Sequence, residues 1–150
     1  MKRYEISLKY SMVSEGPART CKDAESVVDY MFGAFDERPE QETFYVILMN
    51  RKNYPKGRHL CTIGTGSATV INMTEVFRAA IMASAPAIIC VHNHPSGDPT
   101  PSGADIQITR QLRDAAKIVG IDFLDHIVMG DAGSDPAGVG HYSFRNAGLC

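Results

Sequence analysis

Apolar residues along this chain follow two different spacings. From Tyr4 to Met12 they alternate with more polar neighbours, which predicts a strand. Between Ala24 and Phe35 they recur at helical intervals, which predicts an amphipathic helix over about residues 21–35. Thr20 and Asp23 stand in front of that helix at the spacing of a capping box. This part of the chain is therefore expected to form a strand followed by a helix.

The rest of the chain keeps the two spacings interleaved. Short apolar runs predict strands, and longer runs with helical spacing predict helices. The expected strands cover residues 43–49, 59–63, 87–91, 121–129 and 141–144, with a turn over 53–57, and the expected helices cover about 74–84 and the segment from Ser102 to Gly120. Ser102 and Asp105 repeat the capping-box spacing, and Gly120 fits a helix stop. This order indicates an α/β or α+β class, with helices packed on a central sheet.

Length and charge narrow the class of protein. A chain of 150 residues is long enough for a single domain with its own core. The formal net charge of −2 gives no general attraction to nucleic acid or to an anionic membrane, and no run of lysine or arginine marks a basic site. Strong direct binding of nucleic acid is therefore not expected.

The cysteines and the apolar runs bear on the cellular compartment. Cys21, Cys61, Cys90 and Cys150 form no CxxC pair and no dense framework, so we expect reduced thiols. The basic first residues are not followed by the apolar stretch of a secretory signal. No run approaches the roughly 20 apolar residues of a membrane span. These patterns favour a cytoplasmic protein.

The candidate chemistry lies in a polar segment that follows the expected 87–91 strand. Residues two apart in an extended chain point to the same side, so His92 and His94 can converge on one ion. Asp105 lies in the first turn of the next helix, where the loop returns the chain, and could add a carboxylate. Two histidines and one carboxylate, with a fourth position open to water, form a catalytic rather than a structural zinc pattern.

A site of this kind needs a proton acceptor beside the metal. Zinc lowers the pKa of its bound water toward about 7, which gives a hydroxide-like nucleophile. A glutamate that is not itself a ligand can accept the proton. Glu42, at the start of the 43–49 strand, is the best candidate, and spacing alone does not exclude its neighbour Glu40. Ser102 could donate a hydrogen bond to the developing oxyanion.

The spacing of these residues resembles a known motif. A glutamate, His-x-His, seven residues, a serine, two residues and an aspartate make up the JAMM metalloprotease motif, and His94, Ser102 and Asp105 match its intervals. The wider sequence resembles the RadC family of JAB/JAMM domains, in a short form without that family's helix-hairpin-helix region. The matching stretches lie between about residues 20 and 149 and are Glu42-Thr43-Phe44, Leu48 to Arg51, His92 to Asp98, Pro101-Ser102 with Asp105, Leu124 to Val128, and Tyr142-Ser143-Phe144.

The resemblance implies a fold. It would be a deaminase-like α/β/α sandwich, with a central mixed sheet flanked by helices. Residues 21–150 would form the RadC-like domain after an N-terminal extension over residues 1–20, and the two would count as one domain. One departure concerns the second helix, because Met73 and Thr74 stand where the family usually has a Pro-Arg pair. If that arginine holds a substrate, the substrate of this chain differs from the family's.

The resemblance also implies roles. Zinc would be bound by His92, His94 and Asp105, with Glu42 as the acid/base and Ser102 as an oxyanion or water-orienting group. JAMM relatives cut ubiquitin-like tails or small amide substrates. The expected partner is therefore a peptide or isopeptide substrate, and the expected cofactor is Zn²⁺.

Most of these residues also have a plainer interpretation. His92 and His94 could be solvated imidazoles of a polar loop. Ser102 and Asp105 could simply cap a helix, although a cap would also position Asp105 for a metal. His126 stays open between a place beside the ligands, contact with a substrate, and an ordinary buried histidine.

Four other functions compete with hydrolysis. The RadC family is traditionally described as associated with DNA repair, but this chain lacks the helix-hairpin-helix region. A nucleobase deaminase needs His-x-Glu and Pro-Cys-x-x-Cys, and His94 occupies the position of that glutamate. The letters His92-Asn93-His94 resemble an HNH nuclease only by coincidence, because that class spreads its residues over a ββα module. Non-catalytic JAB scaffolds typically lose ligands, and this chain keeps every candidate.

Overall fold

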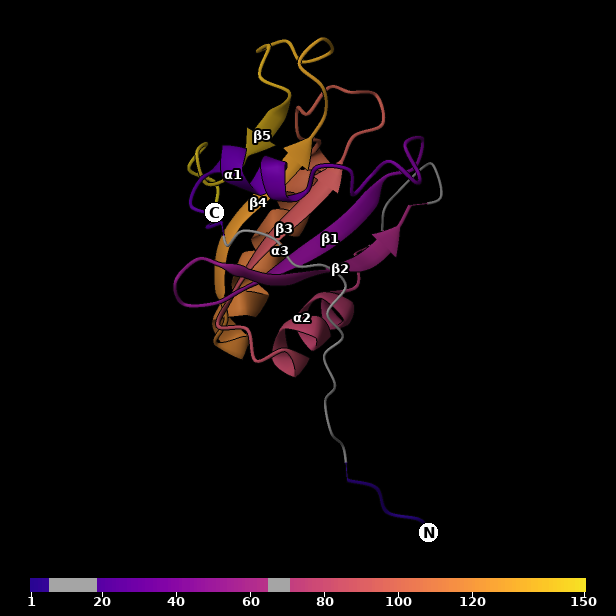
Figure 1. Cartoon of the computed structure of the whole chain (residues 1–150), viewed down its shortest axis with the longest axis vertical. Coiled ribbons are helices and arrows are strands. Elements are labelled where there is room, and N and C mark those ends of the chain that lie inside the picture. Colours follow the sequence, from indigo (N-terminus) through magenta and orange to yellow (C-terminus); the bar gives the residue numbers. More distant parts are fainter. Residues whose placement is uncertain (6–18, 65–70) are drawn as a thin grey trace.

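The structure, a computed structural model, describes residues 1–5, 19–64 and 71–150. Helices and strands are interleaved in these ranges, which confirms the α/β class (Figure 1). In chain order they are α1 (Ala24–Tyr30), β1 (Thr43–Met49), β2 (Pro55–Ile63), α2 (Met73–Met82), β3 (Ala87–Asn93), α3 (Gly103–Val119), β4 (Asp122–Met129) and β5 (His141–Ser143).

The strands form one mixed sheet in the order β2-β1-β3-β4-β5. β3 and β4 run parallel and are connected through α3, whereas the other neighbouring strands are antiparallel. β3 is the middle strand, and all of its residues are buried. Because β1 is antiparallel to β3, the start of β1 lies beside the end of β3, with Phe44 opposite His92.

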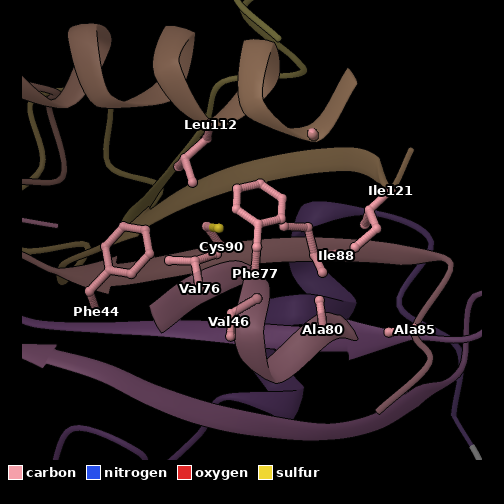
Figure 2. Close-up of a cluster of buried hydrophobic side chains, with 11 residues drawn as sticks. Phe44, Val46, Val76, Phe77, Ala80, Ala85, Ile88, Cys90, Leu112 and Ile121 are labelled. Atoms are coloured by element: carbon pink, nitrogen blue, oxygen red, sulfur yellow. The ribbon is translucent and has the colours of Figure 1, made fainter. Parts of the chain in front are cut away.

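Helices cover both faces of the sheet. Alternate residues of β3 point to opposite faces, so Ile88 and Cys90 face α2 and α3, whereas Ile89 and Val91 face α1. Figure 2 shows the first of these two clusters, with Leu112 of α3 and Phe77 of α2 directed at the sheet. The fold is therefore a three-layer α/β/α sandwich, as the resemblance implied.

The helix expected over residues 21–35 is shorter than its apolar pattern. Asp23 is the N-cap of α1 and forms a capping box with Ser26, so the expected pairing of Thr20 with Asp23 was wrong. The apolar spacing continues past the helix end because Phe35, in the following turns, packs edge-on against Tyr45 of β1. Side-chain packing rather than helix length therefore explains the pattern.

Two strands are longer than expected, and the expected N-terminal strand differs as well. β2 begins at Pro55 and not at His59, because an edge strand tolerates a proline without a backbone N–H. β3 extends through His92 and Asn93, which were expected in a loop. Tyr4 and Glu5 are exposed and lie outside any strand, and most of the expected N-terminal strand lies outside the described residues.

The start and end of α3 confirm the pattern read from the sequence. Ser102 is the N-cap, Asp105 completes the capping box, and Gly120 ends the helix with φ at 80°. Positive φ carries little steric cost for glycine, which has no Cβ. α3 has 17 residues, of which Asp105, Thr109, Leu112 and Ala116 are buried. Across the described ranges, no helix combines the length and the apolar character needed to cross a membrane.

Candidate metal centre

Three elements bring four candidate ligands together at one edge of the sheet. His92 is the last residue but one of β3, and the chain continues from this strand into the turn that carries His94. Glu42 immediately precedes β1, whose start pairs with the end of β3. Asp105 lies in the first turn of α3. One ligand atom from each of these four residues lies within 4.8 Å of the others, so the cluster could hold a metal ion.

The closest contacts join the two imidazoles and the Asp105 carboxylate. The Nε2 atoms of His92 and His94 are 3.2 Å apart. Asp105 Oδ1 lies 3.3 Å from His92 Nε2, and Asp105 Oδ2 lies 3.0 Å from His94 Nε2. Glu42 Oε1 is slightly farther away, at 3.5 Å from His92 Nε2. The three inner groups therefore surround one point, and Glu42 lies beside it.

Burial differs across the cluster. The His92 side chain is 2% exposed and the Asp105 side chain 11%, whereas the Glu42 side chain is 32% exposed. Charged groups are seldom buried together unless a partner or a metal compensates them. The centre therefore combines a buried inner side with a more accessible carboxylate.

The structure separates the two glutamates that spacing left open. Glu40 is exposed and is not a member of the cluster. Glu42 is half-buried, and the residues on either side of it are anchored by one side chain, Asn93. The Asn93 Oδ1 accepts the Thr43 N–H at 2.7 Å, and its Nδ2 donates to the Gln41 carbonyl at 3.0 Å. Sequence reasoning missed this clamp, because it joins residues about 50 apart in the chain.

Ser102 acts as a cap on the same helix that carries Asp105. Its hydroxyl oxygen accepts the Asp105 N–H at 3.1 Å, and its own backbone N–H donates to Asp105 Oδ2 at 2.9 Å. The capping box therefore fixes the orientation of the Asp105 carboxylate relative to the histidines. The interpretation of these residues as a helix cap is therefore compatible with metal binding by Asp105.

Hydrogen bonds keep the Asp105 carboxyl ionised. Burial raises its pKa, but hydrogen bonds with His92 and His94, helped by the Ser102 backbone, outweigh burial and hold the pKa well below its ordinary value. The pKa of His94 is raised, chiefly by its hydrogen bond to Asp105. An ionised carboxylate beside two imidazoles is a suitable donor set for a divalent cation.

A backbone carbonyl sets the tautomer of His94. Its Nδ1 lies 2.9 Å from the carbonyl oxygen of Asp98, which can only accept a hydrogen bond. Nδ1 therefore carries the proton, and in the neutral ring the Nε2 lone pair faces the cluster. Partners that orient a ligating histidine in this way are typical of metal sites.

The turn that carries His94 packs against the segment after β4. Gly97 adopts φ of 88°, and its carbonyl accepts the Asp131 N–H at 2.7 Å. A Cβ on Gly130 would overlap that carbonyl and lie 2.7 Å from its carbon atom. Glycine at Gly130 is therefore required for this close approach of two backbones.

His126 lies behind the ligands and is fully buried. Its Nε2 is 2.8 Å from His92 Nδ1, and its Nδ1 is 2.6 Å from Thr109 Oγ1. Burial, reinforced by the neighbouring His92, holds the pKa of His126 well below its ordinary value, so the ring is neutral. The structure thus places His126 against a candidate ligand. No sequence pattern pointed to Thr109.

The other two histidines, His59 and His141, and the four cysteines lie outside the cluster. His59 of β2 pairs with Glu75 of α2 at 3.1 Å. Cys90 is fully buried in the core, where burial raises the pKa of its thiol well above the ordinary value. All four cysteines lie in the described residues and are free thiols, as expected.

Several UPF0758 proteins are similar in sequence to this chain. A UPF0758 protein of Geobacillus sp. strain WCH70 is 50% identical over 91 residues, covering 61% of this chain. UPF0758 proteins of Methanosarcina mazei and Chlorobium phaeovibrioides are 36% and 43% identical over 128 and 127 residues, each covering 85% of this chain. The aligned parts are 40%, 56% and 53% of the three relatives, so the chain matches only part of their length.

A family model matches most of the chain. The model of the RadC-like JAB domain matches residues 21–149, which include β1 to β5 and every member of the cluster. This range agrees with the stretches from which the sequence alone suggested the family. The chain therefore belongs to the RadC-like JAB domain family.

Proposed function

We propose that this chain is a zinc-dependent hydrolase of the JAMM type that cleaves an amide bond in a peptide or isopeptide substrate. One observation carries the proposal: two imidazole Nε2 atoms and one carboxylate converge, with a second, more exposed carboxylate beside them. Membership of the JAB family supports the same interpretation.

The spacing and chemistry of the inner groups favour zinc. Ligand atoms arranged as a tetrahedron at about 2.0–2.1 Å from an ion are separated by about 3.3 Å. The contacts among His92, His94 and Asp105 are 3.0–3.3 Å. Two neutral imidazoles and one carboxylate, with no thiolate, suit a zinc site that keeps a position open for catalysis.

The proposed chemistry divides among the residues of the chain. A bound zinc ion would supply Lewis acidity, which polarises a carbonyl and acidifies water. Glu42 would accept a proton from the attacking water and return it to the leaving amine. The hydroxyl of Ser102 uses a lone pair in its cap bond, so its O–H can donate to the developing oxyanion. Asp105 and the Asp98 carbonyl would keep the imidazoles oriented.

Metal analysis tests the ligand assignment. The protein would be purified without a metal-affinity tag, and bound metals would be measured by mass spectrometry. We expect about one zinc per chain in wild type, loss of zinc in His92→Ala and Asp105→Ala, and retention in Glu42→Gln. His141→Ala, which changes a histidine outside the cluster, is the matched control. Absence of zinc from wild type after reconstitution would contradict the proposal and favour a non-catalytic JAB scaffold.

Hydrolysis of defined amides tests the reaction. Fluorogenic peptides joined through an α-amide and through a lysine ε-amide would be compared with the zinc-loaded protein. Glu42→Gln should lower kcat by 100-fold or more, that is by about 10²–10⁴ for a lost acid/base. Glu40→Gln makes the same chemical change two residues away at an exposed position and should leave kcat unchanged. Equal effects of the two substitutions would remove Glu42 from the mechanism.

A further inference from the structure

Four polar groups behind the metal ligands form a continuous chain of hydrogen bonds. The Thr109 hydroxyl donates to the backbone carbonyl of Asp105 at 2.8 Å. The same oxygen lies 2.6 Å from His126 Nδ1, and His126 Nε2 lies 2.8 Å from His92 Nδ1. The chain begins and ends on two candidate ligands, Asp105 of α3 and His92 of β3. Thr109 lies four residues after Asp105 and therefore on the same face of α3.

Aromatic side chains enclose this set of hydrogen bonds. Phe144 stacks on the His126 ring with 4.9 Å between the ring centroids and an interplanar angle of 10°. Phe44 meets the same ring edge-on, with 5.5 Å between the centroids. Phe44 also stacks on His92 at 6.0 Å. His126 and Thr109 are buried. Each N–H and O–H must therefore be satisfied by a neighbour inside the enclosure, since a buried group without a partner costs about 1–3 kcal/mol.

The number of protons in the chain restricts where each one lies. Thr109 has one hydroxyl proton, and its bond to the Asp105 carbonyl uses it, so the oxygen accepts from His126 Nδ1–H. A neutral His126 then has a bare Nε2, which accepts from His92 Nδ1–H. A neutral His92 consequently has its lone pair on Nε2, the atom in the metal cluster.

The opposite arrangement of protons would block the centre. If the Thr109 hydroxyl donated to His126 Nδ1, His126 would donate through Nε2–H to His92 Nδ1. His92 would then carry its proton on Nε2, toward Asp105 and His94. A protonated imidazole nitrogen has no lone pair for a metal. The position of the Thr109 hydroxyl proton thus distinguishes a ligand from a non-ligand form of His92.

We propose that Thr109 and His126 are positioning residues that set the tautomer and the ring orientation of His92, so that its Nε2 lone pair faces the metal centre. The inference rests on the proposed metal centre and assigns two residues that are not ligands. It also explains why two ligands on different elements share one set of hydrogen bonds. Removing the hydroxyl leaves His126 Nδ1–H without an acceptor and favours the blocked arrangement.

Zinc affinity of the folded protein tests the role of the hydroxyl. Thr109→Val keeps the shape of the side chain and removes the hydroxyl, whereas Thr109→Ser keeps the hydroxyl. By competition with a chromophoric chelator at fixed pH, we expect Thr109→Val to weaken zinc binding about 10–100-fold. Thr109→Ser should bind within about threefold of wild type, a change well below the 10–100-fold loss expected for Thr109→Val. Thr74→Val, at an exposed position of α2, is the control for the same change elsewhere.

A spectroscopic measurement tests the proton positions independently of affinity. Long-range ¹⁵N correlation spectra of the zinc-loaded wild-type protein distinguish protonated from unprotonated ring nitrogens. We expect the proton of His126 on Nδ1, although free histidine in water favours Nε2. This measurement still decides the question if Thr109→Val does not fold.

The outcomes separate this inference from the proposed function. Zinc bound by wild type and equally well by Thr109→Val, or a His126 proton found on Nε2, would overturn the positioning role while leaving the metal centre intact. Failure of wild type to bind zinc would overturn both. Weaker zinc binding in Thr109→Val, with near wild-type binding in Thr109→Ser, would support the positioning role of Thr109 and His126.

Discussion

The two ends of β3 are equally buried and are held in different ways. Ile88 and His92 project from the same face of the strand, and both are almost inaccessible to solvent. Ile88 packs in the apolar cluster under α2 and α3, as Figure 2 shows. His92 instead touches the candidate ligands on one side and His126 on the other. One strand thus passes from an apolar core into an enclosed polar cluster.

This difference determines which substitutions destabilise each end of β3. In the apolar end, stability depends on the volume and the area that side chains remove from water. In the polar end, each buried group needs a specific partner, because a missing partner leaves the desolvation cost uncompensated. Among the described residues, no buried side-chain nitrogen or oxygen lacks a hydrogen-bond partner. Substitutions in the two ends should therefore change different observables.

The largest loss of stability is expected from the apolar end. Ile88→Ala should lower the free energy of unfolding by about 4 kcal/mol, because it removes buried apolar surface and leaves a cavity. Urea denaturation of the metal-free protein measures this loss. Zinc affinity of the folded variant should match wild type, since Ile88 contacts no candidate ligand.

An exposed isoleucine provides the control for this change. Ile81 of α2 is 57% exposed, and Ile81→Ala should change the free energy of unfolding by no more than about 0.5 kcal/mol. If Ile88→Ala weakened zinc binding as much as it weakened folding, the two ends of β3 would not be independent.

The next largest effect should come from the backbone contact that supports His94. Gly130→Ala places a methyl group against the Gly97 carbonyl, and neither backbone can move away by rotating a side chain. We expect a loss of about 3 kcal/mol in the free energy of unfolding. Zinc binding should also weaken, because the turn that orients His94 must shift. Thermal unfolding with and without zinc measures both effects.

Gly57 provides the matched control for Gly130. No atom lies within 4 Å of the Cβ that Gly57→Ala would add in β2. This variant should therefore be at least as stable as wild type, since glycine is unfavourable within a strand. A stable Gly130→Ala with normal zinc binding would show that the turn tolerates displacement.

Much of the fold could be predicted because it depends on local patterns. The strand over residues 43–49 and the capped helix ending at Gly120 match the structure in position. The first helix was overextended because Phe35 keeps helical spacing while it packs on Tyr45 from a turn. β3 was ended too early because His92 and Asn93 are polar, and polarity normally marks a loop. Tertiary contacts override the local signal at both places.

The candidate site could be predicted only where a motif places its residues. The spacing of His92, His94 and Asp105 was sufficient to predict that their side chains lie together. Choosing Glu42 over Glu40 rested on resemblance, and the structure supplies the physical difference in burial and anchoring. Thr109 was not identified, because one threonine within an amphipathic helix carries no distinguishing local signal. Its partner His126 comes from β4 and in turn contacts His92 of β3, and only the folded chain brings these residues together.

A smaller effect should follow from removing the clamp at the polar end. Asn93→Ala removes the groups that hold Gln41 and Thr43, and it leaves the buried Thr43 N–H without its acceptor. We expect a loss of about 2 kcal/mol in the free energy of unfolding. Zinc affinity should stay close to wild type because Asn93 is not a candidate ligand. Peptide hydrolysis should fall in kcat, because Glu42 loses the anchors on both sides.

The conservative variant separates the two halves of the clamp. Asn93→Asp keeps an acceptor for the Thr43 N–H and loses only the donor to the Gln41 carbonyl. It should therefore be more stable than Asn93→Ala. Equal stability of wild type and Asn93→Ala would mean that the start of β1 is held by strand pairing alone.

The smallest effect should come from a hydrogen bond of Tyr45, which packs against the apolar cluster on the α1 face of the sheet and sharpens the comparison with Asn93. The Tyr45 hydroxyl donates to the Ala34 carbonyl at 3.2 Å on the α1 side of the sheet. Tyr45→Phe removes this bond and keeps the edge-on contact with Phe35. The site is only partly buried, so water can replace the lost donor, and we expect a loss of about 0.5–1 kcal/mol measured by urea denaturation. Zinc affinity and kcat should not change. A loss as large as that of Asn93→Ala would show that this partly buried hydrogen bond contributes as much as the buried clamp, and burial would then not explain the cost of removing the polar groups beside the ligands.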